Sequence, residues 1–166
     1  FSRWLREKAR AGPIVGLDRS APMLREARRL DGVVLVRADA LHLPFADRAF
    51  DVAALITTLE LIPRPRLALR EAFRVARRGV VLGVLNRWSV YNQRRKRRTA
   101  SLHASANLFS PDEMRDLLQP FGAAVVRVAG FVPRRYTFIW LSPLLEWIGR
   151  LVGDQHGAFL AARVVL

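Results

Sequence analysis

The chain has 166 residues and contains no cysteine. This absence excludes disulfide bridges and thiolate metal sites, and it fits a reducing cytoplasm, where we expect the protein to reside. Histidine is scarce as well: His42, His103 and His156 lie far apart in the sequence. They show none of the close spacings that place two imidazoles on one metal ion. We therefore expect no metal site.

Uninterrupted apolar runs of membrane-spanning length are also missing. The most apolar segment, residues 136–152, is interrupted by Pro143, Glu146 and Arg150. It is shorter than the roughly 20 residues that a transmembrane helix needs. The basic first residues lack the apolar run of a secretory signal. We expect segment 136–152 to cover a core or an apolar pocket.

Acidic residues are few: 14 Asp and Glu against 28 Lys and Arg give a formal net charge of +14. Such an excess is typical of nucleic-acid-binding proteins. Most arginines, however, alternate with glutamate and apolar residues in the manner of solvated helix faces. The one concentrated run, residues 94–98, lacks neighbouring aromatic residues that stack on bases. The sequence disfavours nucleic acid as a partner, favours an anionic substrate or peripheral membrane contact slightly more, and indicates no particular oligomeric state.

Apolar runs of strand length alternate with segments of helical period, which predicts an α/β fold with a mostly parallel sheet and helices on both faces. At 51% hydrophobic residues, residues 1–166 suffice for a single domain with a buried core. Strands are predicted at residues 13–18, 33–39, 80–86, 123–131 and 157–166, with a further strand beginning at residue 51. Helices are predicted at residues 20–30, 64–78 and 110–122, the second of them ended by Gly79.

Two aspartates follow the first two predicted strands. In open α/β sheets, ligands bind at the carboxyl ends of the strands. A carboxylate at the position of Asp18 typically accepts hydrogen bonds from both ribose hydroxyls of a nucleotide, and Asp39, one strand later, fits an acceptor for an exocyclic adenine amine. Each residue alone is equally well explained as a turn or helix-capping aspartate. Together they indicate a nucleoside pocket.

Four blocks of sequence carry a more specific signal: GLDRSAPMLREAR, VRADALHLPFADRAFDVAALITTLELIP, LREAFRVARRGVVLGVLN and FSPDEMRDLLQPFG. They resemble the successive blocks of the class I S-adenosylmethionine-dependent methyltransferases, above all the small-molecule group (type 11-like) that includes quinone-biosynthesis enzymes. The resemblance covers essentially the whole chain, and the block from Asp39 to Asp51 is its most specific part. It implies a Rossmann-like sheet with an antiparallel final strand, S-adenosylmethionine as cofactor, and methyl transfer.

The resemblance also implies roles for individual residues. It assigns cofactor binding to Asp18, Met23, Asp39, Ala40, Leu41, Thr57, Thr58 and Leu59. Asp18 would hold the ribose, Met23 would pack on the adenine, and Asp39 would bind the adenine amine with help from the backbone that follows it. The residues from Thr57 to Leu59 would line the methionine and sulfonium end. For Met23 and Leu59, packing in the core is an equally good interpretation.

The sequence departs from the family pattern in two places. The family's first strand and glycine-rich loop are missing, since residues 1–12 resemble the helix that follows that loop. We therefore expect a domain that lacks its N-terminal part. Many relatives have histidine where this chain has Leu61, so no catalytic imidazole is carried over there.

The methyl acceptor and the catalytic residue are less well defined. Displacement of a methyl group from a sulfonium needs alignment and exclusion of water, and a general base is optional. The candidates for such a base are Glu60, Tyr91 and His103, each with a structural alternative, so the catalytic residue is left unassigned. Residues 87–109 and 131–156 are expected to form a substrate lid. Their aromatic content indicates a small apolar or aromatic acceptor.

Two other functions compete with methyl transfer. A nicotinamide-dependent oxidoreductase is disfavoured because the sequence has no G-x-G-x-x-G motif. A degenerate methyltransferase-like module that binds nucleic acid or protein stays open. Salt-dependent binding to RNA or DNA that is abolished by neutralising residues 94–98 would favour it.

The missing glycine-rich loop generates a first prediction. Because backbone of that loop approaches the cofactor closely in the family, and because loss of the first strand leaves two strand edges unpaired, the 166-residue chain should bind S-adenosylmethionine weakly or not at all. Calorimetric titration measures this directly. Micromolar affinity would contradict the expectation.

Overall fold

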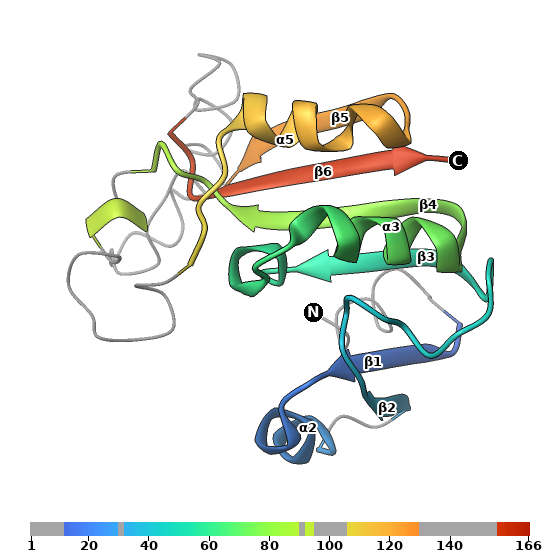
Figure 1. Cartoon of the computed structure of the whole chain (residues 1–166). Helices are drawn as coiled ribbons and strands as arrows, with labels where there is room; N and C mark the ends of the chain where they lie inside the picture. The colour runs from blue at the N-terminus through green and yellow to red at the C-terminus, as the bar shows by residue number, and fades with distance from the viewer. Residues whose placement is uncertain (1–11, 30–31, 90–91, 95–105, 130–155) are drawn as a thin grey trace. The chain divides into compact units, whose positions relative to one another are not determined.

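The computed structural model describes residues 12–29, 32–89, 92–94, 106–129 and 156–166 (Figure 1). The chain divides into two compact units, Phe1–Ala46 and Asp47–Leu166, and each is described by itself. The predicted cover segment at residues 136–152 lies outside the described residues, as do residues 95–105 and 131–155 of the predicted lid segments. In the part of the chain that is described, no helix has the length and apolar character needed to cross a membrane.

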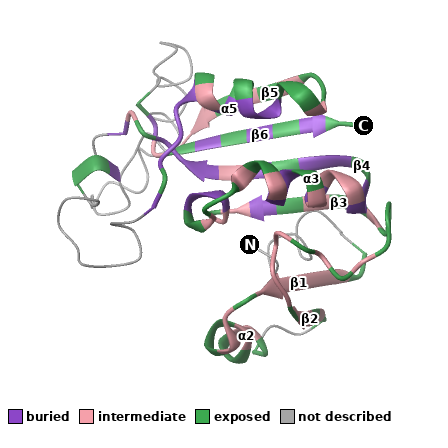
Figure 2. Ribbon diagram, viewed as in Figure 1, coloured by how far each residue is buried: buried purple, intermediate pink, exposed green. Residues whose placement is uncertain are grey.

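The first unit is a strand, a helix and a second strand: β1 Ile14–Asp18, α2 Ala21–Ala27 and β2 Val33–Arg37. The strands pair in parallel from Ile14 opposite Val33 to Asp18 opposite Arg37, as predicted. None of the described residues of this unit is fully buried (Figure 2). Two strands with one short helix are too few to enclose side chains completely.

Helix α2 begins where the sequence predicts. Ser20 is its N-cap, the Ser20 hydroxyl accepts a hydrogen bond from the Met23 amide at 3.4 Å, and proline occupies the first turn. The helix ends at Ala27, three residues before the predicted end at Leu30. Gly32, at a φ of 71°, then leads the chain into β2.

The second unit contains a four-stranded sheet of β3 Phe50–Ile56, β4 Ala76–Leu85, β6 Phe159–Val165 and β5 Ala124–Ala129, in that spatial order. Strands β3 and β4 are parallel, and β6 runs antiparallel to both of its neighbours. The prediction of an antiparallel final strand is therefore confirmed. Pairing of β6 between β4 and β5 brings the C-terminal residues into the centre of this sheet.

Two helices, α3 Pro65–Val75 and α5 Pro111–Leu118, lie on the same face of the four-stranded sheet (Figure 1). The buried residues of this unit lie on both helices and along the strands of the sheet (Figure 2). Fully buried members include Leu59, Leu69, Leu82, Met114 and Leu160. Burial of such large apolar side chains stabilises the unit by roughly 1.5–3 kcal/mol each.

The predicted start of α5 is confirmed in detail. Ser110 and Glu113 form a capping box, in which the Ser110 hydroxyl accepts from the Glu113 amide at 3.2 Å and the Glu113 carboxylate accepts from the Ser110 amide at 2.8 Å. The helix passes into a 3-10 turn, Gln119–Phe121, and ends at Gly122. Phe121 stacks on Phe73 of α3 with a centroid separation of 4.3 Å.

The predicted boundary between α3 and β4 is wrong. The sequence predicts a helix to residue 78 that Gly79 ends, whereas α3 ends at Val75 and β4 begins at the next residue. The reason is a bulge: Phe50 pairs with Ala76 but Val52 pairs with Gly79, so β4 holds one extra residue.

Gly79 has a different role from the predicted one. Its φ of 157° lies in a region that favours glycine, and a Cβ at this position would overlap the carbonyl oxygen of Val164 in β6. Glycine is therefore needed where the bulged strand approaches its neighbour, and it does not terminate a helix.

Replacement of Gly79 by alanine should lower the free energy of unfolding by about 2–4 kcal/mol, since it adds both steric overlap and backbone strain. Urea unfolding monitored by circular dichroism measures the change. Gly12→Ala is a matched control, because an added Cβ meets nothing within 4 Å there. Equal stability of the two variants would contradict the role assigned to Gly79.

Candidate functional site

The two predicted nucleoside-binding aspartates lie at the same edge of the parallel pair in the first unit. Asp18 is the last residue of β1, and its register partner is Arg37, the last residue of β2. Asp39 follows two residues later, and the Ala38 amide donates to the Asp18 carbonyl at 3.3 Å. The structure thus brings the two acids to neighbouring strand ends, as the sequence predicts.

Each carboxylate uses one oxygen to form a turn. Oδ1 of Asp18 accepts from the Ser20 amide at 2.7 Å, and Oδ1 of Asp39 accepts from the Leu41 amide at 2.9 Å. Within the described residues, the second oxygen of each carboxylate takes no hydrogen bond. The turn interpretation and the ligand interpretation are therefore compatible, since one oxygen fixes the side chain and the other stays available as an acceptor.

The other candidate cofactor-binding residues in the first unit differ in the groups that they leave available to a ligand. Met23 is 59% exposed, which rules out a core role for its side chain within this unit. The amide of Leu41 is already bound to Asp39, so only its carbonyl and side chain remain for other contacts. Ala40 is half-buried between these two residues.

The turn after β3 in the second unit carries the predicted threonines. Thr57 has a φ of 48°, a left-handed conformation that is uncommon for a β-branched residue. Its amide donates to the Gly83 carbonyl at 2.7 Å, and the hydroxyls of Thr57 and Thr58 both donate to the Ile56 carbonyl, at 2.8 and 3.1 Å. Backbone strain of this kind concentrates at functional sites. No sequence pattern predicts this strain.

Leu59 and Glu60 lie in the 3-10 turn Leu59–Leu61 that follows. Leu59 is 0% exposed, so its side chain belongs to the core. Glu60 is 2% exposed; its Oε1 accepts from the Leu85 amide at 2.6 Å, and its carbonyl accepts from the Asn107 amide at 2.8 Å. Glu60 therefore joins this turn to the end of β4 and to the segment before α5.

Burial controls the ionisation of Glu60. Desolvation raises the pKa of its carboxyl above the ordinary value, against the opposing effect of hydrogen bonds from its own amide and that of Leu85. Its Oε2 atom is buried and has no hydrogen-bond partner among the described residues. Both observations favour the protonated carboxyl. The other two candidates for a general base, Tyr91 and His103, lie outside the described residues.

Asn86, directly after β4, is fully buried and organises the strand end. Its side chain donates to the Gly157 carbonyl at 2.7 Å and accepts from the Trp88 amide at 3.1 Å. Asn92 donates to the carbonyls of Asn86 and Ala158 at 3.0 and 2.7 Å. These bonds tie the chain that leaves β4 to the chain that enters β6, a connection that the sequence did not reveal.

Among the described residues, no group of three His, Cys, Asp or Glu side chains could hold a metal ion. The acceptors and donors at the strand ends are instead oxygens and amides of the kind that bind an organic ligand.

Comparison with known proteins gives a family. A model of the methyltransferase domain matches residues 1–84, half of the chain. An uncharacterized protein from Methanocaldococcus jannaschii is 30% identical over 112 residues, which cover 65% of this chain and 54% of that protein. A demethylmenaquinone methyltransferase from Lactiplantibacillus plantarum is 40% identical over 78 residues, 43% of this chain and 33% of that protein. The chain thus spans between a third and about half of the length of these relatives.

Solved structures agree with this match. An S-adenosylmethionine-dependent methyltransferase from Thermotoga maritima, described as a possible histamine N-methyltransferase, has a TM-score of 0.73 and 25% identity, covering 90% of this chain and 71% of that one. An S-adenosylmethionine-dependent methyltransferase from Mesorhizobium loti has a TM-score of 0.64 and 15% identity, covering 99% and 85%; at this identity the likeness concerns the fold alone. The chain belongs to the methyltransferase domain family and has the Rossmann-like fold of the class I S-adenosylmethionine-dependent methyltransferases.

Proposed function

We propose that the chain provides part of an S-adenosylmethionine site, which by itself binds the cofactor only weakly, and serves methyl transfer to a small apolar or aromatic acceptor. One observation carries the proposal: Asp18 and Asp39 stand at adjacent strand ends, each with one carboxylate oxygen fixed by a backbone amide and the other open. A ribose diol and an adenine amine present donors that such oxygens accept. When bound, the cofactor supplies an activated methyl group on a positively charged sulfur.

The turn at Thr57 and Thr58 suits the charged end of that cofactor. Both hydroxyl hydrogens are directed to the Ile56 carbonyl, which leaves the lone pairs of the two oxygens as the groups available to a ligand. Oxygen lone pairs favour a positively charged neighbour. We assign this turn to the methionine and sulfonium portion, with the strained Thr57 backbone held by its bond to Gly83.

Glu60 acts in this proposal as a positioning residue and not as a general base. Its carboxyl is buried and directed to the Leu85 amide in the interior, so it is not placed to meet an acceptor. Alignment of the methyl group and its acceptor dominates this chemistry. The buried Glu60 side chain supports the Thr57–Thr58 turn and so contributes to that alignment.

The acceptor is proposed from the relatives and from composition. The Lactiplantibacillus plantarum relative acts on a demethylmenaquinone, which favours an aromatic ring as acceptor. Trp88 follows β4 closely, and the buried Phe109 bridges to Asn86, so both place aromatic side chains near the end of that strand. The alternative of a non-catalytic binding module gains no support from these relatives.

Asp39→Asn tests the cofactor assignment. The amide keeps an oxygen for the Leu41 amide, so the turn survives, but it presents an NH₂ group where the adenine amine needs an acceptor. We expect S-adenosylmethionine binding to weaken about tenfold or more. Saturation-transfer NMR detects the weak binding that we expect of this chain.

Asp47→Asn is the matched control for that experiment, because it removes the same charge from an exposed carboxylate that pairs with Arg74 at 2.8 Å. Its effect on binding should stay within about twofold. Equal losses in the two variants would refute the role of Asp39.

Glu60→Gln tests the supporting role of the buried Glu60 carboxyl. Because the folded-state pKa of Glu60 is raised, its contribution to stability is complete below the unfolded pKa of about 4.3 and is lost as pH rises through the folded pKa. Glutamine keeps the acceptor for Leu85 and does not titrate, so the variant should gain stability relative to the wild type as pH rises.

Urea unfolding between pH 4 and pH 8 measures the difference between the two proteins. Glu26→Gln, which removes an exposed carboxylate that pairs with Arg29, is the control and should show no comparable trend. Parallel pH profiles of the wild type and Glu60→Gln would show that the Glu60 carboxyl is not buried in its neutral form.

A further inference from the structure

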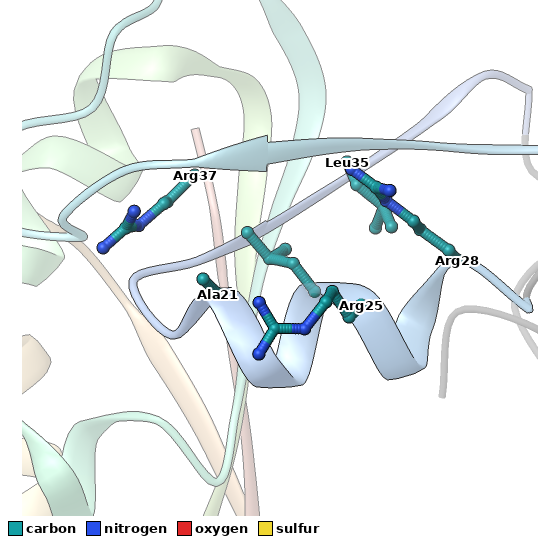
Figure 3. Close-up of a pocket in the computed structure, with 6 residues that line it drawn as sticks. Ala21, Arg25, Arg28, Leu35 and Arg37 are labelled. Atoms are coloured by element: carbon teal, nitrogen blue, oxygen red, sulfur yellow. The ribbon is translucent and has the colours of Figure 1, made fainter.

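A groove in the first unit adjoins the site described above but contains none of its proposed cofactor-binding residues. It has a volume of about 310 Å³ between α2 and β2 (Figure 3). Its lining consists of Ala21, Leu24, Arg25, Arg28, Leu35 and Arg37. The helical members recur at intervals of three and four residues and form one stripe, and the two strand members share one face of β2.

Arginine is unexpected on this stripe. A helix that packs on a sheet normally presents apolar residues along the line that faces the strands. Here Leu24 and Leu35 follow that rule, whereas the other three long side chains that line the groove are arginines. In Figure 3, Arg25 and Arg28 extend from the helix and Arg37 from the strand, with Arg28 beside Leu35.

The three positive charges have no carboxylate partner among the described residues. Arg37 donates through Nε to the Arg19 carbonyl at 3.2 Å, a neutral acceptor. The one carboxylate of α2, Glu26, pairs with Arg29 at 2.9 Å, and neither residue lines the groove. The groove therefore combines an apolar floor with uncompensated guanidinium donors.

We propose that this groove binds the phosphate group of an organic phosphate. Guanidinium groups match the oxygens of phosphate in charge and in planar, paired donor geometry, and the presence of three arginines in one groove favours an anion of more than one charge. Leu24 and Leu35 supply contact for the organic part that carries the phosphate. The phosphate comes either from a free small molecule or from a lipid headgroup.

This ligand differs from the cofactor. S-adenosylmethionine has no phosphate and carries a positive sulfonium, so the arginine groove does not suit it, whereas the carboxylates of Asp18 and Asp39 do. The inference therefore does not depend on the proposed methyl transfer.

Exposed arginines elsewhere provide a contrast. Arg66 and Arg70 of α3 are also exposed and have no ion pair among the described residues. They are exposed positions of a helix whose buried positions are Ala68, Leu69, Ala72 and Val75, and neither of them lines the groove between α2 and β2. They supply a control with the same change in net charge.

The test compares Arg25→Gln/Arg28→Gln with Arg66→Gln/Arg70→Gln in the 166-residue chain. Calorimetric titration with inorganic pyrophosphate at low salt should show binding that weakens about tenfold or more in the groove variant and less than about twofold in the control. A second arm measures co-sedimentation with phosphatidylcholine vesicles, with and without phosphatidic acid. If pyrophosphate binding depends on the groove, the result supports a free phosphate ligand. If only vesicle binding depends on the groove, the result supports a lipid headgroup.

Two outcomes overturn the proposal: binding to neither probe, or equal losses in both variants, which would reflect net charge only. A measurement on the unaltered chain guards against misfolding of the groove variant. Addition of the bound probe should shift the amide NMR signals of residues 21–28 and 35–37. Shifts confined to other residues would equally rule the groove out.

Discussion

Parallel pairing of neighbouring strands is the constraint on which the candidate site depends. Strands β1 and β2 pair over five residues in uniform register, so the chain leaves both at the same edge. The same rule applies to β3 and β4, where the Thr57 amide still bonds to Gly83 one residue beyond the end of β3. Residues that follow each strand therefore collect at one edge of their own sheet, although they are far apart in sequence.

Strand ends also leave backbone groups without ladder partners, and buried side chains satisfy them. The Glu60 carboxyl takes the Leu85 amide, and the Asn86 side chain bonds to Gly157 and Trp88. Such groups are costly to bury without partners, so the polar side chains are needed for the loops to leave the sheet in one conformation. Oε2 of Glu60 has no hydrogen-bond partner among the described residues, and its burial is least unfavourable when the carboxyl is protonated.

Much of this fold could be predicted because its signals are local. Ser20 and Ser110 are N-cap residues, and each has a proline in the helical turn that follows. This pattern predicted both helix starts correctly. Asp18 and Asp39 could be placed because each directly follows an apolar strand. The boundary at Val75 could not be predicted, because the bulge in β4 depends on partners distant in sequence: Arg77 pairs with Asp51 at 3.0 Å, and Gly79 meets β6.

The arginines of α2 show where composition misleads. In the sequence they alternate with glutamate and apolar residues and indicate a solvated face, yet only the geometry reveals that Arg25 and Arg28 share a stripe with Leu24, facing β2. One strand–helix–strand unit thus carries carboxylates at its strand ends and guanidinium groups in its groove that form no ion pair with each other among the described residues. Arg37 is the register partner of Asp18, yet it donates to the Arg19 carbonyl and Asp18 accepts from the Ser20 amide. Because opposite charges on one small unit would otherwise pair, this arrangement favours two ligands of opposite charge over a single internal network.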